Sequence, residues 1–135
     1  MHMKDRRWTH NPDMVISDMS YSAVWCTKFR RPFLTEEVQN ELRKCIEERC
    51  SAISVIIDSL NIYSDHVCID FRTVPTNCPH WVVTQLKHYT SGILREDFPD
   101  LKKKAPTLWT RAYLMYTNKV AGLNIDDFLD KQRGK

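Results

Sequence analysis

The sequence predicts an α+β domain in which helices cover one face of an antiparallel sheet. Three observations lead to this expectation: β-branched and aromatic residues recur in short runs, two longer segments carry apolar residues at helical spacing, and the runs and helical segments alternate along the chain. With 135 residues, the chain is long enough for one domain or for a subunit completed by oligomerisation. We expect a polar arm over residues 1–18 and the domain over residues 19–135.

The first half of the domain is expected to form a strand, a helix and two further strands. A threonine, with glutamates in the first turn and apolar residues at helical spacing after it, marks the start of the helix. The strands are recognised by their β-branched and aromatic residues. In order, we expect a strand over 19–26, a basic turn over 28–32, a helix from Thr35 to Arg49, a strand over 53–57, a turn or strand end over 61–64 and a strand over 67–71.

The second half is expected to add a helix, a fourth strand and a terminal helix. A loop containing two prolines precedes the second helix, whose apolar residues form one stripe. In order, we expect a helix over 80–97, a basic loop over 102–106, a strand over 108–117 and a short helix over 124–132. The order β-α-β-β-α-β followed by a helix is that of the ferredoxin-like, split βαβ arrangement. In this arrangement two helices cover one face of the sheet and leave the other face open.

The composition limits the cellular compartment and the kinds of binding partner that we expect. With 20 basic and 17 acidic residues, the formal charge is +3, which is compatible with nucleic acid binding without requiring it. The five cysteines include no CxxC pair, and we interpret them as reduced thiols of a cytosolic protein. The N-terminal segment has no apolar signal-peptide region, and no apolar run is long enough to span a membrane. We therefore expect a cytoplasmic protein without a membrane partner.

One predicted strand carries a pattern that approaches a metal site. Side chains alternate between the faces of a strand, so the apolar residues from Val67 to Phe71 point into the core, and His66, Cys68 and Asp70 point to the open face. Residues two apart on a strand lie about 6.6 Å apart along the chain, close enough for His66 and Cys68 to hold one ion. His66 and Asp70 lie about 13 Å apart, which is too far to share an ion.

Four stretches of the chain carry a family resemblance through their order and spacing, and they cover most of the chain from about residue 20 onward. They are residues 24–34 (VWCTKFRRPFL), residues 65–67 (DHV), residues 86–91 with 94–99 (LKHYTS and LREDFP) and residues 108–113 (LWTRAY). Together they resemble the small single-tyrosine HUH transposases and their relatives associated with palindromic repeats. That family moves insertion sequences as single-stranded DNA and has a His-hydrophobic-His pattern on one strand.

The resemblance implies several properties of the whole protein. It implies a homodimer with two sheets joined edge to edge, and binding to single-stranded DNA or to DNA hairpins near element ends. It implies a divalent metal ion, Mg²⁺ or Mn²⁺, held by the two histidines of the HUH pattern and by a polar residue of the terminal helix. It also implies a tyrosine on that helix, which attacks the DNA phosphate and keeps the 5′ end covalently.

The chain departs from the family at two catalytic positions. Phe128 stands where the family has its tyrosine, and a phenylalanine has no oxygen with which to attack a phosphate. Cys68 stands where the second histidine is expected after His66, while Gln132, one helical turn after Phe128, matches the third metal ligand. Thiolates suit softer ions such as Zn²⁺ better than Mg²⁺ or Mn²⁺. We therefore expect a protein that binds single-stranded or hairpin DNA without cleaving it, and a metal site that is weak or empty.

Two other functions stay open: an active transposase that uses Tyr113, Tyr116 or an activated water, and a dimeric interaction scaffold. Structural roles also compete with chemical ones, because Phe128 could pack the helix onto the sheet instead of stacking on bases, and Cys68 could fill space instead of binding zinc. Acids that neutralise the basic turn in the fold would disfavour nucleic acid binding. The residues expected to contact DNA are Lys28, Arg30, Arg31, Lys87, His88 and Arg111.

Overall fold

The structure of the chain is a computed structural model, and it describes residues 9–10, 16–17, 19–117 and 125–134. Most of the expected N-terminal arm lies outside the described residues, and its boundary stays a prediction. Two short strands in that region, β1 (Thr9–His10) and β2 (Ile16–Ser17), pair antiparallel. In the described part of the chain, no helix is long and apolar enough to cross a membrane.

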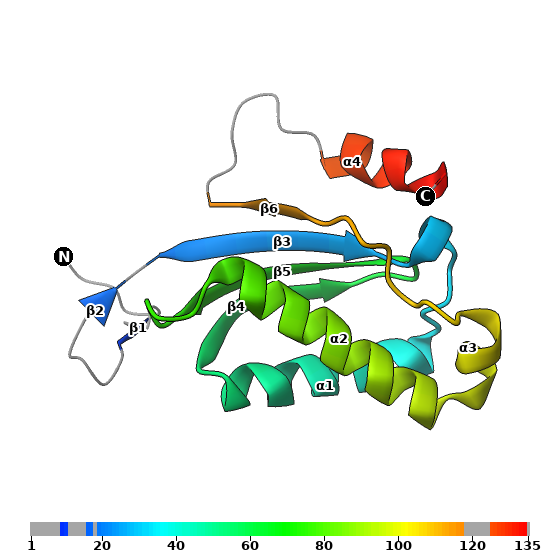
Figure 1. Cartoon of the computed structure of the whole chain (residues 1–135), viewed down its shortest axis with the longest axis horizontal. Coiled ribbons are helices and arrows are strands. Elements are labelled where there is room, and N and C mark those ends of the chain that lie inside the picture. Colours follow the sequence, from blue (N-terminus) through cyan, green and yellow to red (C-terminus); the bar gives the residue numbers. More distant parts are fainter. Residues whose placement is uncertain (1–8, 11–15, 18, 118–124, 135) are drawn as a thin grey trace.

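A four-stranded antiparallel sheet forms the centre of the domain (Figure 1). Its strands are β3 (Ser20–Cys26), β4 (Val55–Ile62), β5 (His66–Thr73) and β6 (Leu114–Tyr116), and their order across the sheet is β4-β5-β3-β6. Each neighbouring pair runs antiparallel. The order along the chain and the order across the sheet are together those of the split βαβ arrangement, so the predicted α+β fold class is confirmed.

Two long helices contact each other on one face of this sheet (Figure 1). α1 (Glu36–Ala52) begins at Thr35, whose side-chain oxygen accepts a hydrogen bond from the Val38 backbone nitrogen at 3.4 Å, as the predicted cap requires. α2 (Pro79–Asp97) begins with a proline in its first turn. The main apolar core lies between these helices and the sheet and includes the fully buried Phe71. The apolar residues of β5 therefore face this core, as the alternation predicts.

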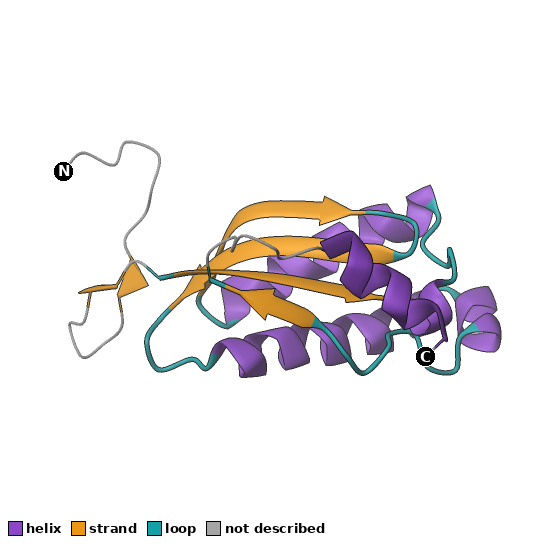
Figure 2. Ribbon diagram, turned by 90° about the horizontal axis from the view of Figure 1, so that it is seen from above, coloured by secondary structure: helices purple, strands orange, loops and turns teal. Residues whose placement is uncertain are grey.

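The opposite face of the sheet carries the C-terminal segment, which crosses in front of the strands in Figure 2. α4 (Ile125–Lys131) is followed by a 3-10 turn, η2 (Gln132–Gly134). Leu129 of α4 packs with Val24 and Cys26 of β3 in a second, smaller apolar cluster. The terminal helix therefore covers part of the sheet face that the two long helices leave open. Its expected first residue lies outside the described residues.

The fourth strand is much shorter than the sequence predicts, because the segment before it bulges away from β3. The predicted strand over 108–117 is wrong for residues 108–113. Trp109 forms a single bridge with Thr27, and regular pairing with β3 resumes only at Leu114. Between these two points, two residues of β3 face four residues of the other segment. The surplus pushes this segment out of the sheet, in the manner of a β-bulge.

Two boundaries differ from the sequence-based expectations for local reasons. The basic loop predicted over 102–106 begins inside a short helix, α3 (Pro99–Lys104), because Leu101 is buried in the main core and a proline is tolerated in the first turn. β4 begins at Val55, two residues later than expected, and ends at Ile62, inside the segment expected to be a turn or a strand end. The delay arises at Ser54, whose φ of 62° follows the end of α1.

Candidate functional site

His66, at the first position of β5, is held by neighbours on two sides. Its Nδ1 atom lies 2.6 Å from a carboxylate oxygen of Asp65, and its ring stacks on the Tyr63 ring with centroids 4.4 Å apart. The contact with Asp65 occupies Nδ1, so Nε2 is the ring nitrogen that could face a ligand. A carboxylate at the other ring nitrogen is also how metal-binding histidines are usually oriented. His66 therefore keeps one feature of a metal ligand.

Cys68 lies on the same face of the sheet, beneath the terminal helix. It faces Val24 across the β3–β5 pair and packs against the small apolar cluster. Burial, and to a lesser degree the Asp70 carboxylate, raises the pKa of the Cys68 thiol to about 11, so the thiol is protonated at neutral pH. Asp70 itself accepts a hydrogen bond from Ser22 at 2.6 Å. This environment is that of a small apolar side chain that fills space.

The terminal helix brings Phe128 and Gln132 to this face. Phe128 packs against the same cluster as Cys68. Gln132 is only 3% exposed, and its Nε2 atom donates a hydrogen bond to the Phe128 carbonyl at 3.2 Å. Its Oε1 atom is buried and has no hydrogen-bond partner among the described residues. An unsatisfied buried acceptor is uncommon in proteins, and it is stabilised by any donor or cation that reaches it.

The donors at these positions do not fit the hard divalent cation that the family resemblance implies. Mg²⁺ and Mn²⁺ prefer oxygen ligands. Here the His66 imidazole and the Gln132 amide oxygen are accompanied by the protonated Cys68 thiol, and it is the thiolate that binds metals. In the part of the chain that the structure describes, no group of three or more His, Cys, Asp or Glu side chains could hold a metal ion.

Arg30, which the sequence predicts as a DNA contact, ties the terminal helix to the sheet. Its Nε atom donates to Asp65 at 2.9 Å, and its Nη1 atom donates to Asp130 of α4 at 3.0 Å. Asp65 thereby contacts Arg30 and His66 at the same time, with one carboxylate oxygen for each. Of the three cations predicted for the basic turn, Arg30 is the one that acids among the described residues neutralise.

The other two cations of that turn, Lys28 and Arg31, flank an aromatic ring. The turn is a short 3-10 segment, η1 (Lys28–Arg30). Lys28 Nζ lies 5.2 Å and Arg31 Cζ 5.4 Å from the centroid of the Phe29 ring. Neither cation pairs with a carboxylate among the described residues. Sequence reasoning missed Phe29, although aromatic residues interleaved with basic ones are a feature of single-strand binding surfaces.

A wide groove runs between α2 and the segment before β6, with a volume of about 500 Å³. Lys87, His88 and Arg111 line it, so the three remaining predicted contact residues lie together. The Lys87 ammonium donates to the carbonyl oxygens of Thr110 and Arg111 at 2.8 and 3.1 Å, and it lies 5.5 Å from the centre of the Tyr113 ring. Burial lowers the pKa of Lys87 to about 8.

The two tyrosines considered as replacement nucleophiles both lie away from His66. Tyr113 lines the groove, where its hydroxyl is hydrogen-bonded to His80 Nδ1 and the two rings stack with centroids 5.7 Å apart. Tyr113 packs against the main core, on the face of the sheet that α1 and α2 cover. Tyr116 pairs with Ser22, four residues along β3 from the partner of His66, which is a separation of about 13 Å.

Comparisons with known protein families and with curated proteins agree with each other. The family model described as "Transposase IS200 like" matches residues 15–129. The chain is also 22% identical over 123 residues to the ISDra2 transposase TnpA of Deinococcus radiodurans, and the alignment covers 89% of this chain and 88% of that protein.

Comparison with solved structures gives the same fold. The crystal structure of a protein from Deinococcus radiodurans that has been assigned as a transposase matches with a TM-score of 0.81 at 22% identity, over 96% of this chain and 98% of that chain. A REP-associated tyrosine transposase bound to a REP hairpin matches with a TM-score of 0.55 at 12% identity, over 97% of this chain and 68% of that chain.

Proposed function

The chain belongs to the family of IS200-like transposases, as its resemblance to HUH transposases predicts, and on this premise we propose that it binds hairpin or single-stranded DNA without cleaving it. One observation carries the proposal. At the position of the family's tyrosine, the helix that packs on the open face of the sheet presents the ring of Phe128 to an apolar cluster. The scaffold is kept, and the group that would form the covalent bond is replaced by a packing residue.

The proposed loss of cleavage rests on the chemistry of two side chains. Covalent attack on a DNA phosphate needs a nucleophile, and Phe128 carries no oxygen that could act as one. Cys68 replaces an imidazole with a side chain that packs in the same apolar cluster as Phe128. Each change alone would impair the reaction, and both fall on the face of the sheet where the family resemblance places the catalytic centre.

The proposed DNA binding rests on the groove along α2, where Lys87, His88 and Arg111 converge. Cations in a groove attract a phosphate backbone by neutralising its charge, and the resulting affinity falls as salt rises. The REP-associated tyrosine transposase that shares this fold was solved bound to a REP hairpin. A groove of about 500 Å³, with Lys87 and Arg111 in its walls, offers a place for the phosphate backbone of such a stem on this chain.

We further propose that the protein acts as a homodimer through the edge of its sheet. β4 and β6 are the two edge strands, and β4 is the longer, with eight residues against three. An edge strand presents unpaired backbone N–H and C=O groups along one side, which a second copy can pair. β4 is therefore our candidate for the edge-to-edge contact that the family resemblance implies. Sedimentation at several protein concentrations tests it, and a monomer at all concentrations would contradict it.

A hairpin titration tests the DNA binding. A fluorescent DNA hairpin should bind at low salt, and its affinity should fall linearly with salt on a double-logarithmic plot. Arg111→Gln should weaken binding and lower the salt slope by about one, because one phosphate contact is lost. Lys44→Gln is a matched control, because Lys44 is an exposed cation of α1 outside the groove. If neither protein shifts any hairpin while the dimer forms, the interaction scaffold replaces our proposal.

A cleavage assay tests the loss of activity. A labelled single strand with a hairpin is incubated with the protein and Mg²⁺ or Mn²⁺, and we expect no covalent protein–DNA band on a denaturing gel. The hydrogen bond between His80 and Tyr113 is the one observation that favours a replacement nucleophile. A covalent band that disappears in Tyr113→Phe would therefore contradict our proposal and support an active enzyme.

A further inference from the structure

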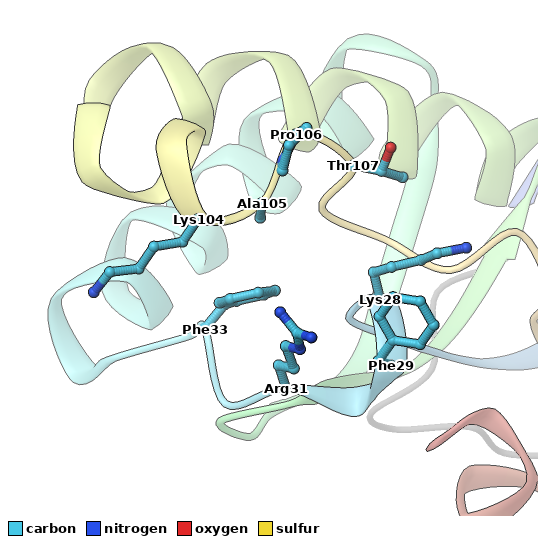
Figure 3. Close-up of a pocket in the computed structure, with 8 residues that line it drawn as sticks. All are labelled: Lys28, Phe29, Arg31, Phe33, Lys104, Ala105, Pro106 and Thr107. Atoms are coloured by element: carbon cyan, nitrogen blue, oxygen red, sulfur yellow. The ribbon is translucent and has the colours of Figure 1, made fainter. Parts of the chain in front are cut away.

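A small pocket lies between the turn after β3 and the segment after α3 (Figure 3). Its volume is about 230 Å³, below the range of roughly 300–1,000 Å³ that pockets for drug-sized ligands have, so its size suits a single planar group. None of the described residues that line it is acidic. Its walls include Phe29, Phe33 and Pro106, and its cations are Lys28, Arg31 and Lys104.

A strained backbone presents Phe29 at this pocket. The φ of Phe29 is 58° and that of Arg30 is 57°, in the left-handed region that bulky residues rarely adopt. The turn is held by the Thr27 hydroxyl, which donates to the Arg31 carbonyl at 2.6 Å, and by the Arg30 N–H, which donates to the Thr27 carbonyl at 2.8 Å. Phe29 is 42% exposed and joins neither apolar cluster. Strain that keeps an aromatic ring in solvent points to a binding role.

We propose that this pocket binds an unpaired nucleobase of DNA, stacked on Phe29, with the flanking phosphates held by the cations around it. The aromatic ring supplies a face on which any base can stack, and Lys28 and Arg31 supply positive charge beside that face. Because no acid is among the described residues of the lining, no negative charge among them repels a phosphate. The inference rests on the proposed function, since the base belongs to the DNA whose stem lies with its backbone along the groove.

The pocket and the groove adjoin along one rigid segment of the chain. Thr107 lines both of them. On either side of Trp109, backbone hydrogen bonds fasten the segment to the end of β3, from the Lys28 N–H to the Leu108 carbonyl at 2.8 Å and from the Thr110 N–H to the Cys26 carbonyl at 3.0 Å. A stem in the groove therefore places an adjoining unpaired nucleotide next to the pocket. The stem and the unpaired nucleotide would thus contact adjoining parts of the same segment.

Three DNA hairpins with the same stem test the proposal. One carries a short single-stranded DNA tail, the second carries the same tail with abasic sites in place of its bases, and the third has no tail. Base stacking on an aromatic ring contributes about 1–3 kcal/mol, so the wild-type protein should bind the normal tail about 5-fold to 150-fold more tightly than the abasic tail. A 2-aminopurine in the tail should lose fluorescence on binding, because stacking quenches it.

The variant Phe29→Leu removes the aromatic face but keeps an apolar side chain and the same backbone strain. It should lose the preference for bases and the quenching, while its binding to the tailless hairpin stays unchanged. Trp81→Leu is the matched control, because Trp81 is 40% exposed on α2 and lines neither hollow. Arg31→Gln is a second variant that should weaken binding to both tails equally. Equal thermal unfolding of all variants shows that they are folded.

The outcomes separate this inference from the proposed function. If the wild-type protein binds every hairpin but ignores the bases of the tail, the pocket does not bind a base and the proposed function stands. If the preference for bases persists in Phe29→Leu, the stacking site lies elsewhere. Tighter binding of a ribonucleotide tail than of the DNA tail would overturn the assignment to DNA. If no hairpin binds at low salt, the proposed function and this inference both fail.

Discussion

Replacing Arg30 tests which of its two ion pairs, with Asp65 beside β5 or with Asp130 of the terminal helix, contributes more to the stability of the fold. The side chains of Arg30 and Asp65 are 14% and 17% exposed, so their hydrogen-bonded ion pair is largely shielded from water. The side chain of Asp130 is 67% exposed, so solvent and salt screen the second pair. The distances do not separate the two pairs, because they are 2.9 and 3.0 Å. We therefore expect the difference in burial to make the Arg30–Asp65 pair stronger than the Arg30–Asp130 pair.

The expected coupling free energies of Arg30 with Asp65 and with Asp130 follow from this difference in burial. A hydrogen bond to a charged group, shielded from water, contributes about 1.5–3 kcal/mol, and we expect this coupling free energy between Arg30 and Asp65. An exposed ion pair contributes about 0.2–1 kcal/mol, and we expect this coupling between Arg30 and Asp130. His66 lowers the penalty when Arg30 is removed, because it stays beside the Asp65 carboxylate.

Two double-mutant cycles measure these couplings. Arg30→Met removes the charge and keeps the side-chain stem, and Asp65→Asn and Asp130→Asn remove the partner charges with little change in shape. Urea unfolding gives the free energy of each single and double variant, at one fixed protein concentration because the stability of a dimer depends on concentration. A coupling to Asp130 as large as that to Asp65 would refute the reasoning from burial.

Three further perturbations test separate parts of the structure. Phe128→Ala should lower the free energy of unfolding by about 2 kcal/mol, less than the roughly 3–5 kcal/mol of a fully buried phenylalanine, because this side chain is only partly buried; urea unfolding that showed no loss would contradict its packing role. Thr35→Ala should cost about 1 kcal/mol in the same assay, because the Val38 N–H loses its cap, and an unchanged midpoint would mean that this bond contributes nothing. The pKa of Lys87 falls from 10.5 to about 8 on folding, so the unfolded chain binds more protons between these values and stability rises with pH in that window. The free energy of unfolding of the wild type should therefore increase relative to that of Lys87→Met as pH rises from 8 to 10.5. A difference between the two proteins that stays constant with pH would argue against a desolvated ammonium.

Strand β5 is an example of a feature of the fold that local sequence patterns predict. Val67, Ile69 and Phe71 are buried against the helices, while Cys68 lies on the other face, as a period of two requires. The cap at Thr35 is equally local, because it joins residues within one turn. Such features depend on neighbours in the sequence, and they were predictable for that reason.

The candidate site was only partly predictable. The sequence alone singled out Phe128 and Cys68 as departures from the family, because a missing oxygen and a changed ligand are visible in the residue types. It could not tell that Arg30 turns toward two acids while Lys28 and Arg31 pair with no carboxylate in the described part of the chain. It also passed over Phe29, whose exposure depends on a left-handed turn that no residue-type pattern predicts for a phenylalanine.

The sequence by itself determined the order of the four sheet strands, the two long helices and the terminal helix, the family, and the absence of a hydroxyl at position 128, because these depend on residue identity and short-range periodicity. Only the tertiary structure decided where the surplus residues before β6 bulge outward, and that this segment lines both the groove and the pocket. Only it could join Arg30 to Asp130, which lies 100 positions further along the chain. Such contacts depend on strand register and on how a helix packs across a sheet, and both are set by many distant residues acting together.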